Sequence, residues 1–162
     1  MTAPSKSRSG PAIAAVGPED LEEVRSIFRE YAQGLLASHC LAGFDDEVRG
    51  LPGAYAAPKG RLLVARVGRR AAGCVAVRPV RGAACEMKRL YVRPAFRGKG
   101  LGRALAERAI AEAKKAGYRR MLLDTLPTMR EALMLYAVLG FTSAEPYLDA
   151  PAPGALCFEK AL

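Results

Sequence analysis

Residues 84–103 read ACEMKRLYVRPAFRGKGLGR, and this passage sets the architecture that we expect for the chain. Its first nine residues alternate apolar and charged side chains, which is typical of a half-buried strand. From residue 101 to about 116, apolar residues recur at three- and four-residue intervals, which indicates an amphipathic helix. The passage therefore predicts a strand and a helix joined by a loop rich in glycine.

The loop has the composition of a phosphate-binding site. It consists of Arg97, Gly98, Lys99, Gly100, Leu101 and Gly102, with Arg103 directly after it. A junction between a strand and a helix offers main-chain NH groups and the positive end of the helix dipole. Glycines allow the backbone to approach an anion closely, and the three cations would neutralise it. A Walker loop is excluded because no Lys-Ser or Lys-Thr follows at the required spacing, and Arg103 replaces the last glycine of the dinucleotide fingerprint.

Strand and helix patterns continue on both sides of this passage. Towards the N-terminus we expect a strand at 12–16, a helix at 21–35, and strands at 61–67 and 71–80. Towards the C-terminus we expect a strand at 119–124, a helix at 128–139, and strands at 141–144 and 155–161. Segment 43–60 is rich in glycine and proline, so we predict a loop with at most a short helix at 45–49.

The strand at 84–92 carries an irregularity. Cys85 and Met87 alternate with Glu86 and Lys88, but this phase would then place Leu90 and Val92 on the charged face. One extra residue in a strand reverses the phase of every side chain that follows. We therefore predict a one-residue bulge near Arg89.

Length and composition bound the class of protein. The chain has 162 residues, of which 51% are hydrophobic and 25% are charged, so it is expected to form one globular domain rather than a disordered or fibrous chain. We expect a flexible tail at 1–10 and a single domain at 11–162. No apolar run is long enough for a spanning helix, and the first residues do not resemble a secretory signal. The sequence therefore predicts a cytoplasmic protein without a membrane partner.

The net charge of +9 is unevenly distributed. Between Lys59 and Arg120 there are 18 Lys and Arg residues but only three acidic residues. Such a basic middle favours an anionic ligand, either nucleic acid or a small polyphosphate, although it is also compatible with a solvated basic face. Aromatic residues make up only 7% and tryptophan is absent, which leaves little surface for stacking bases. We therefore expect no nucleic-acid partner.

The cysteines indicate neither a disulfide framework nor a metal site. Cys40, Cys74, Cys85 and Cys157 form no CxxC pair, and their wide spacing lacks the paired chelate geometry of zinc sites. We interpret them as small buried hydrophobic residues and expect no metal. The alternative is a nucleophile pair formed by Cys40 and the single histidine, His39.

The loop resembles the Arg-x-x-Gly-x-Gly/Ala signature of the GNAT superfamily, the acyl-CoA-dependent N-acetyltransferases, through Arg97, Gly100 and Gly102. The segments EMKRLYV, LGRALAERAIAEA, RRMLLDT and LYAVLGF are similar to consecutive core elements of that family, and the resemblance covers about residues 12–162. It implies an α/β (α+β) GNAT-like three-layer fold. In this fold, a mixed, mostly antiparallel sheet of about seven strands is splayed between strands 4 and 5, with helices on both faces.

The resemblance also implies acetyl-CoA as the co-substrate, bound in the opening between strands 4 and 5 of the sheet. The pantetheine arm would bond the backbone of Leu90, Tyr91 and Val92, and the pyrophosphate would bind the loop from Arg97 to Arg103. The family often has Asn seven residues before the tyrosine of the last helix, but this chain has Met129 there, so that side-chain contact is not implied. The acceptor would be a primary amine of a small molecule, an amino acid or a peptide. A homodimer would be ordinary for the family.

Direct attack of an amine on a thioester requires a free amine. Freeing a lysine-like amine at neutral pH costs about 4 kcal/mol, corresponding to roughly three pK units, and a general base lowers this cost. The resemblance implies that Glu86 is this base, directly or through water. Glu86 is also the single carboxylate between Glu47 and Glu107. The alternative is an exposed strand residue paired with Arg78 or Lys88.

The resemblance implies that Tyr136 donates a proton to the departing thiolate; the alternative is a core aromatic packed with Leu133 and Leu139. We expect Tyr147 and the proline-rich loop around it to border the acceptor cleft. The acidic residues at 45–47, Asp-Asp-Glu, either attract a cationic amine or cap a helix. Phe44 and Tyr55 either border the cleft or close a core. A non-catalytic acyl-CoA-binding or regulatory module is the competing function, which the joint presence of a base and an acid disfavours.

Overall fold

The computed structural model of the chain describes residues 10–35, 43–149 and 151–162. The helices are α1 (Leu21–Gly34), α2 (Phe44–Arg49), α3 (Leu101–Lys115) and α4 (Arg130–Val138). The strands are β1 (Ala12–Ala15), β2 (Arg61–Val67), β3 (Arg70–Pro79), β4 (Ala84–Val92), β5 (Arg120–Thr125), β6 (Thr142–Ser143) and β7 (Leu156–Ala161). The expected order of elements is confirmed. Most of the expected tail, together with His39 and Cys40, lies outside the described residues.

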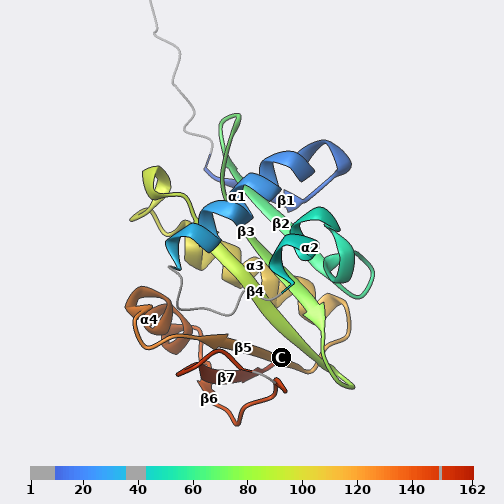
Figure 1. Cartoon of the computed structure of the whole chain (residues 1–162), viewed down its shortest axis with the longest axis vertical. Helices are drawn as coiled ribbons and strands as arrows, with labels where there is room; N and C mark the ends of the chain where they lie inside the picture. Colours follow the sequence, from blue (N-terminus) through green and yellow to red (C-terminus); the bar gives the residue numbers. More distant parts are fainter. Residues whose placement is uncertain (1–9, 36–42, 150) are drawn as a thin grey trace, which may run out of the picture.

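The strands form one mixed sheet in the order β1-β2-β3-β4-β5-β7-β6, as Figure 1 shows. All neighbouring strands are antiparallel except β4 and β5, which are parallel. A parallel pair needs a crossover connection, and α3 supplies it. The expected mixed, mostly antiparallel sheet is therefore confirmed.

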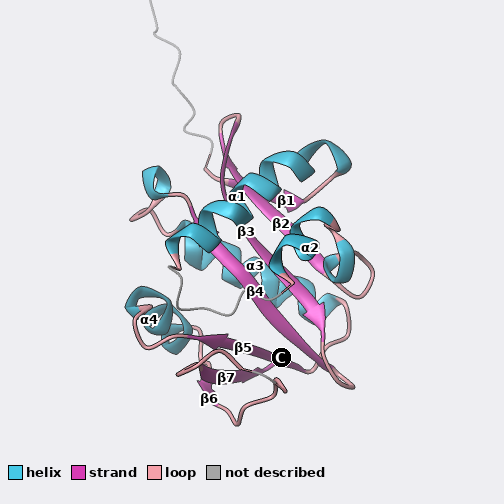
Figure 2. Cartoon of the chain, viewed as in Figure 1, coloured by secondary structure: helices cyan, strands magenta, loops and turns pink. Residues whose placement is uncertain are grey.

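The sheet is splayed at its parallel pair. The pairing of β4 with β5 extends only from Ala84 opposite Arg120 to Glu86 opposite Leu122. Beyond this short junction the two strands diverge, and Figure 2 shows the gap widening towards α4. The β1–β4 strands thus form one wing of the sheet, and β5, β7 and β6 form the other.

Helices cover both faces and bury a separate core on each. On one face, α1, α2 and the turn at Gly53–Tyr55 pack against alternate residues of β2–β4, with Phe28, Phe44 and Tyr55 buried among them. On the other face, α3 packs with the opposite residues of the strands and with Tyr136 and Phe141. The interpretation of Phe44 and Tyr55 as core aromatics is therefore confirmed. No described helix combines the length and the apolar character needed to cross a bilayer.

The bulge in β4 is present. Arg89 has a positive φ of 59°, and the register against β3 shifts between Cys74 and Ala76. As a result Leu90 and Val92 pack with the α3-side core, on the same face as Cys85 and Met87. The bulge also increases the local twist of the strand, which helps β4 to turn away from β5. The three described cysteines are buried and free, in agreement with their interpretation as small hydrophobic residues.

Candidate active site

Two connected hollows lie where β4 and β5 part. The larger, here called the groove, has a volume of about 650 Å³ and runs between the end of β4, the glycine loop and the start of α4. The smaller, here called the inner cavity, has a volume of about 310 Å³ and lies deeper between the strands. Tyr31, Leu90 and Met129 line both hollows, so a ligand in the groove would reach the inner cavity.

The glycine loop presents a row of free amide groups to the groove. None of the main-chain NH groups of residues 98–103 has a hydrogen-bond partner in the described part of the chain. Gly98 and Gly100 have φ values of 77° and 78°, a left-handed conformation that glycine adopts without steric cost. Gly100 directly precedes the first turn of α3, where the helix dipole adds positive potential. These features suit a bound diphosphate.

The cations of the loop have different roles. The Arg97 side chain folds back: its Nε donates a hydrogen bond to the Val92 carbonyl oxygen at 2.8 Å, and its guanidinium lies 5.3 Å from the centre of the Tyr91 ring. It therefore holds the loop against the end of β4. Lys99 is exposed, and the Arg103 Nε is 2.8 Å from a carboxylate oxygen of Glu107 on the same helix. Arg97 and Lys99 thus form no ion pair among the described residues, and Lys99 is the one of the two that is not held by a neighbouring carbonyl oxygen and ring.

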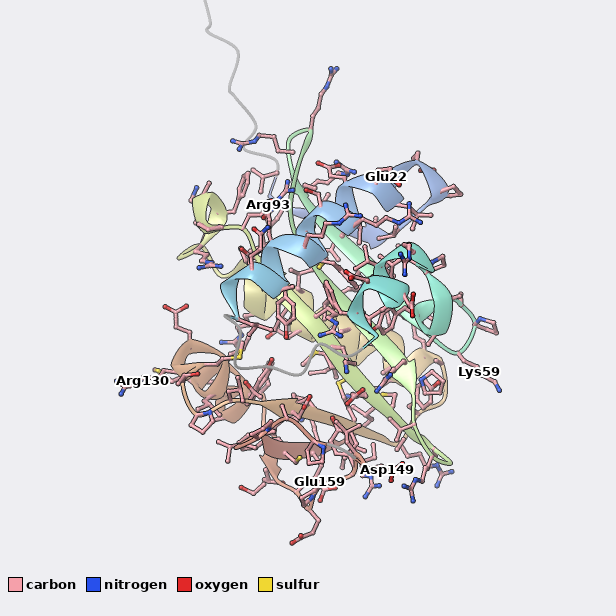
Figure 3. The ribbon with its side chains drawn as sticks, viewed as in Figure 1. Glu22, Lys59, Arg93, Arg130, Asp149 and Glu159 are labelled. Carbon is pink, nitrogen blue, oxygen red and sulfur yellow. The ribbon has the colours of Figure 1, made fainter. Side chains whose placement is uncertain are left out.

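The end of β4 offers main-chain groups to the groove. The Arg93 NH donates to the Ala72 carbonyl oxygen on β3 at 2.8 Å. Because successive residues of a strand point their polar groups to opposite sides, those of Val92 and Leu90 point towards the gap. The β5 pairing has already ended there, so these groups face no neighbouring strand. The Arg93 side chain, labelled in Figure 3, reaches Glu30 of α1 at 3.1 Å and fixes this end of the strand.

Tyr136 lines the inner cavity from α4 and is 8% exposed. Its ring packs edge-on against Phe141, with centroids 5.8 Å apart. Burial raises the pKa of the Tyr136 phenol, and the nearby groups Tyr31 and Asp124 add to this shift. Its ring therefore belongs to the core, as the alternative interpretation of the sequence expected, and also faces the cavity.

Glu86 lies behind the wall of the inner cavity and is fully buried. Its Oε1 accepts a hydrogen bond from the Arg78 Nε at 2.7 Å and is 3.7 Å from the Lys88 Nζ. Its Oε2 accepts a hydrogen bond from the Tyr147 hydroxyl. The ion pair with Arg78 expected for the alternative is present, but the carboxylate is buried rather than exposed.

The acidic trio separates into different roles. Glu47 forms an ion pair with Arg89, with Nε and Oε2 2.8 Å apart, and accepts a hydrogen bond from the Tyr55 hydroxyl at 3.0 Å. These contacts hold the pKa of Glu47 below its ordinary value even though burial opposes this shift. Asp46 pairs with Arg49 on the surface. Glu47 is therefore the member of the trio that lines the inner cavity.

Two residues that the sequence did not single out as site residues also line the inner cavity: Asp124 of β5 and Tyr31 of α1. Burial raises the pKa of the Asp124 carboxyl, and the neighbouring charge of Glu86 adds to the shift. The signal for Asp124 was present in the sequence, since it closes the predicted buried strand RRMLLD. Which residues lie across the gap from Asp124, however, depends on how β5 pairs with β4.

The geometry fits a known family. The model of the acetyltransferase (GNAT) family matches residues 21–141. The chain belongs to the GNAT family. It is therefore an N-acetyltransferase of this family, as its sequence predicted.

Relatives of this GNAT chain match most of its length. An uncharacterised N-acetyltransferase of Schizosaccharomyces pombe is 43% identical over 145 residues, which cover 88% of this chain and 89% of the relative. The YjgM N-acetyltransferase of Escherichia coli, also uncharacterised, is 32% identical over 137 residues, covering 83% and 77%. The yncA structure of Salmonella typhimurium, solved with its cofactor acetyl-CoA, has a TM-score of 0.76 at 20% identity and covers 94% of each chain. This last similarity concerns the fold.

Proposed function

We propose that this GNAT protein transfers the acetyl group of acetyl-CoA to a primary amine by direct attack of the amine on the thioester. The observation that carries the proposal is the row of unpaired NH groups at residues 98–103, set at the start of α3 beside a groove that opens into a polar cavity. An acyl-CoA needs both features, because its diphosphate is anionic and its pantetheine arm is long and narrow. The acetyl-CoA bound in the Salmonella structure of the same fold supports this assignment.

In this proposal, the diphosphate binds the loop 98–103, and the pantetheine arm lies along the main chain of Leu90 and Val92 in place of the missing strand. The thioester then reaches the junction of the groove and the inner cavity, where Tyr136 and Met129 lie. Met129 accepts a hydrogen bond from the Thr125 hydroxyl at its sulfur, at 3.4 Å. The acceptor amine enters from the inner cavity.

We assign Glu86 as the general base and Tyr136 as the general acid. Because Glu86 does not line the inner cavity, it takes the proton of the ammonium through an intervening water molecule, and its ion pair with Arg78 holds the carboxylate in place. The amine nitrogen then attacks the thioester carbon, a C–N bond forms and the C–S bond breaks. Tyr136 stays protonated because its pKa is raised, so its hydroxyl is available to the departing sulfur.

The proposal is tested by measuring thiol release from acetyl-CoA across a panel of primary amines, with the wild type and Glu86→Gln. The wild type should release thiol only when an amine is present. Loss of a general base should lower kcat/KM by about 10²-fold at neutral pH. This deficit should shrink as the pH rises towards the pKa of the amine, because free amine then needs no base.

Two results would contradict the proposal. Tight acetyl-CoA binding without release of thiol to any amine would indicate a binding or regulatory module. A deficit in Glu86→Gln that is equal at all pH values would show that Glu86 acts only in holding the structure. Thermal unfolding of both proteins provides the control for folding.

A further inference from the structure

The charges around the inner cavity pair off almost completely. Arg89 pairs with Glu47 at 2.8 Å, and Arg78 pairs with Glu86 at 2.7 Å. Among the described residues of the cavity wall, one further cation and one further anion then remain, Lys88 and Asp124. The inner cavity is thus close to neutral overall but carries two separated charges of opposite sign.

The register of the sheet places these two residues on opposite sides of the gap between β4 and β5. Glu86 of β4 and Leu122 of β5 form the last pair before the strands part. Lys88 lies two residues beyond Glu86 and Asp124 two residues beyond Leu122, so both side chains point to the face covered by α1 and α2. Paired strands lie about 4.8 Å apart, and the gap widens from there. The two charged side chains therefore face the gap from strands that diverge beyond this last pair.

Among the described residues, Lys88 has only a long ion pair, with Glu86, and Asp124 has no ion pair. The Lys88 ammonium and the Asp124 carboxylate do not form an ion pair with each other, and no described side chain donates a hydrogen bond to Asp124. The nearest carboxylate oxygen to the Lys88 Nζ is Glu86 Oε1 at 3.7 Å, which is already bonded to Arg78. The Lys88 side chain is only 17% exposed. Charges held away from water without a partner are costly, so a ligand that supplies both partners would be bound strongly.

On the basis of the proposed function, we propose that the acceptor is a free amino acid, whose amine hydrogen-bonds to Asp124 and whose carboxylate binds Lys88. A free amino acid holds an amine and a carboxylate on one carbon, which matches two opposite charges on the two sides of a narrow gap. A peptide N-terminus lacks the nearby carboxylate and would leave Lys88 with only its long contact to Glu86. This choice distinguishes among the small-molecule, amino-acid and peptide acceptors that the family allows.

The titration of the two groups agrees with this assignment. Burial lowers the pKa of the Lys88 amine and raises that of the Asp124 carboxyl. Opposing influences come from every element around them: Glu86 and Asp124 favour the charged form of Lys88, whereas Arg89 and Arg78 disfavour it. Glu86 disfavours ionisation of Asp124, whereas Lys88 and Arg89 favour it. A zwitterion placed between them would stabilise the charged form of each group.

The volume of the inner cavity limits the size of the acceptor. A volume of about 310 Å³ lies at the lower end of the range of small-molecule sites, about 300–1,000 Å³. The rest of the described wall combines apolar residues such as Met87 and Leu126 with the polar groups of Tyr31, Thr125 and Tyr136. We therefore assign a small or medium-sized amino acid.

The reaction balances with these groups. The bound ammonium loses one proton to the base, and its nitrogen forms a bond to the acetyl carbon as the C–S bond breaks. The second proton, lost by the nitrogen as the amide forms, replaces the one that Tyr136 gives to the thiolate. Asp124 orients the amine by accepting a hydrogen bond, and Lys88 holds the carboxylate without entering the chemistry.

The test first measures thiol release from acetyl-CoA with each of the twenty L-amino acids. The best acceptor is then compared with its amide, which lacks the carboxylate charge, and with its decarboxylated amine. The wild type should acetylate the amino acid with a kcat/KM at least tenfold above both analogues. Lys88→Met should lose most of this preference because kcat/KM falls for the amino acid alone. Lys114→Met, an exposed lysine in the last turn of α3, is the matched control and should leave the ratio unchanged.

Because the readout is a ratio of acceptors within one protein, partial misfolding of a variant cannot imitate it. Equal or better acetylation of the amide or the decarboxylated amine by the wild type would overturn the inference while leaving the proposed function intact. An equal decrease for all three acceptors in Lys88→Met would overturn the inference in the same way.

Absence of thiol release with every amine would instead refute the proposed function. In that case, the amino-acid site is tested separately from the activity, by equilibrium dialysis of the twenty radiolabelled amino acids against the protein saturated with coenzyme A. Binding that Lys88→Met and Asp124→Asn abolish would keep the amino-acid site, and absence of binding would overturn it as well.

Discussion

At the scale of single residues, burial changes what each ionisable group of the site can do. Tyr136 and Asp124 line the same cavity, and burial raises the pKa of both. For the phenol this shift favours the protonated form, which can donate a proton. For the carboxyl it disfavours the ionised form that would bind an amine. The same burial therefore favours the function of one residue and opposes that of the other.

Tyr136→Phe should lower kcat by about 10²-fold, because the departing thiolate loses its proton donor. KM for acetyl-CoA should remain within about twofold, since the ring still fills its place against Phe141. Steady-state thiol release measures both values. Tyr118→Phe is the matched control, because its hydroxyl bonds the Lys59 carbonyl far from the groove. A wild-type kcat in Tyr136→Phe would exclude acid catalysis by this residue.

Asp124→Asn should stabilise the protein at neutral pH and inactivate it. The folded-state pKa of Asp124 lies above its ordinary value of 3.8, so the folded state binds the proton more tightly than the unfolded state. The wild type therefore loses stability as the pH rises through this window, and the variant does not. Urea unfolding at several pH values should show an advantage of the variant at pH 7 that vanishes near pH 4.

The activity of Asp124→Asn should fall at least tenfold in kcat/KM for the acceptor, with unchanged acetyl-CoA affinity. In the wild type, kcat/KM should decline as the pH falls through the raised pKa of this carboxyl, because protonation removes the negative charge that attracts the ammonium group of the acceptor. A variant that is both less stable and fully active would contradict the assignment.

At the scale of elements, two irregularities in the chain create the groove. The bulge at Arg89 turns the end of β4 and directs the main chain of Leu90 and Val92 into the gap. The left-handed glycines at 98 and 100 leave the NH groups before α3 unpaired. The first NH groups of a helix have no partner within the helix, and the end of β4 has no strand beside it, so both sets of groups stay available to a ligand.

Gly100→Ala should weaken acetyl-CoA binding at least tenfold. The alanine Cβ is disfavoured at a φ of 78°, at a cost of about 1–2 kcal/mol, so the loop changes shape and its NH groups diverge. Gly82→Ala is the matched control: Gly82 also has a positive φ, of 54°, and open space for a Cβ, but it lies at the turn between β3 and β4. Both variants should lose similar stability, and calorimetric titration should show lower affinity for Gly100→Ala alone. Equal affinities would contradict the proposed diphosphate site.

At the scale of the whole molecule, the two wings of the sheet are joined by a short parallel pair and by the core beneath α3 and α4. This arrangement leaves a gap in the middle of the sheet instead of at its edge. A ligand that lies along β4 in the gap would contact both wings and stabilise their packing against each other. Ligand binding and folding stability are therefore linked in this protein.

Acetyl-CoA at a concentration 100 times its Kd should raise the free energy of unfolding by about 2.7 kcal/mol. Urea unfolding with and without the ligand measures the change. Coenzyme A without the acetyl group should give a similar gain, since the diphosphate and pantetheine provide the contacts. An absent gain in the wild type, or an undiminished gain in Gly100→Ala at the same ligand concentration, would show that the ligand binds elsewhere.

The sequence by itself determined the elements, the bulge and the glycine loop, because each depends on neighbours within a few residues. The two-residue period of β4 and the break at Arg89 are visible without knowing any partner strand. The resemblance to the family also implied Glu86 and Tyr136 as site residues. The burial of Glu86 and its pairing with Arg78 followed from the tertiary structure.

Only the tertiary structure decided how Lys88 and Asp124 are placed relative to one another. They are 36 positions apart in the chain, and a helix lies between them. The strand period fixes the face to which each points, but their opposition depends on the parallel register that pairs Glu86 with Leu122. That register is set by the packing of α3 across the sheet, which involves contacts distant in sequence. The charge pattern of the inner cavity is therefore a property of the folded chain rather than of any segment.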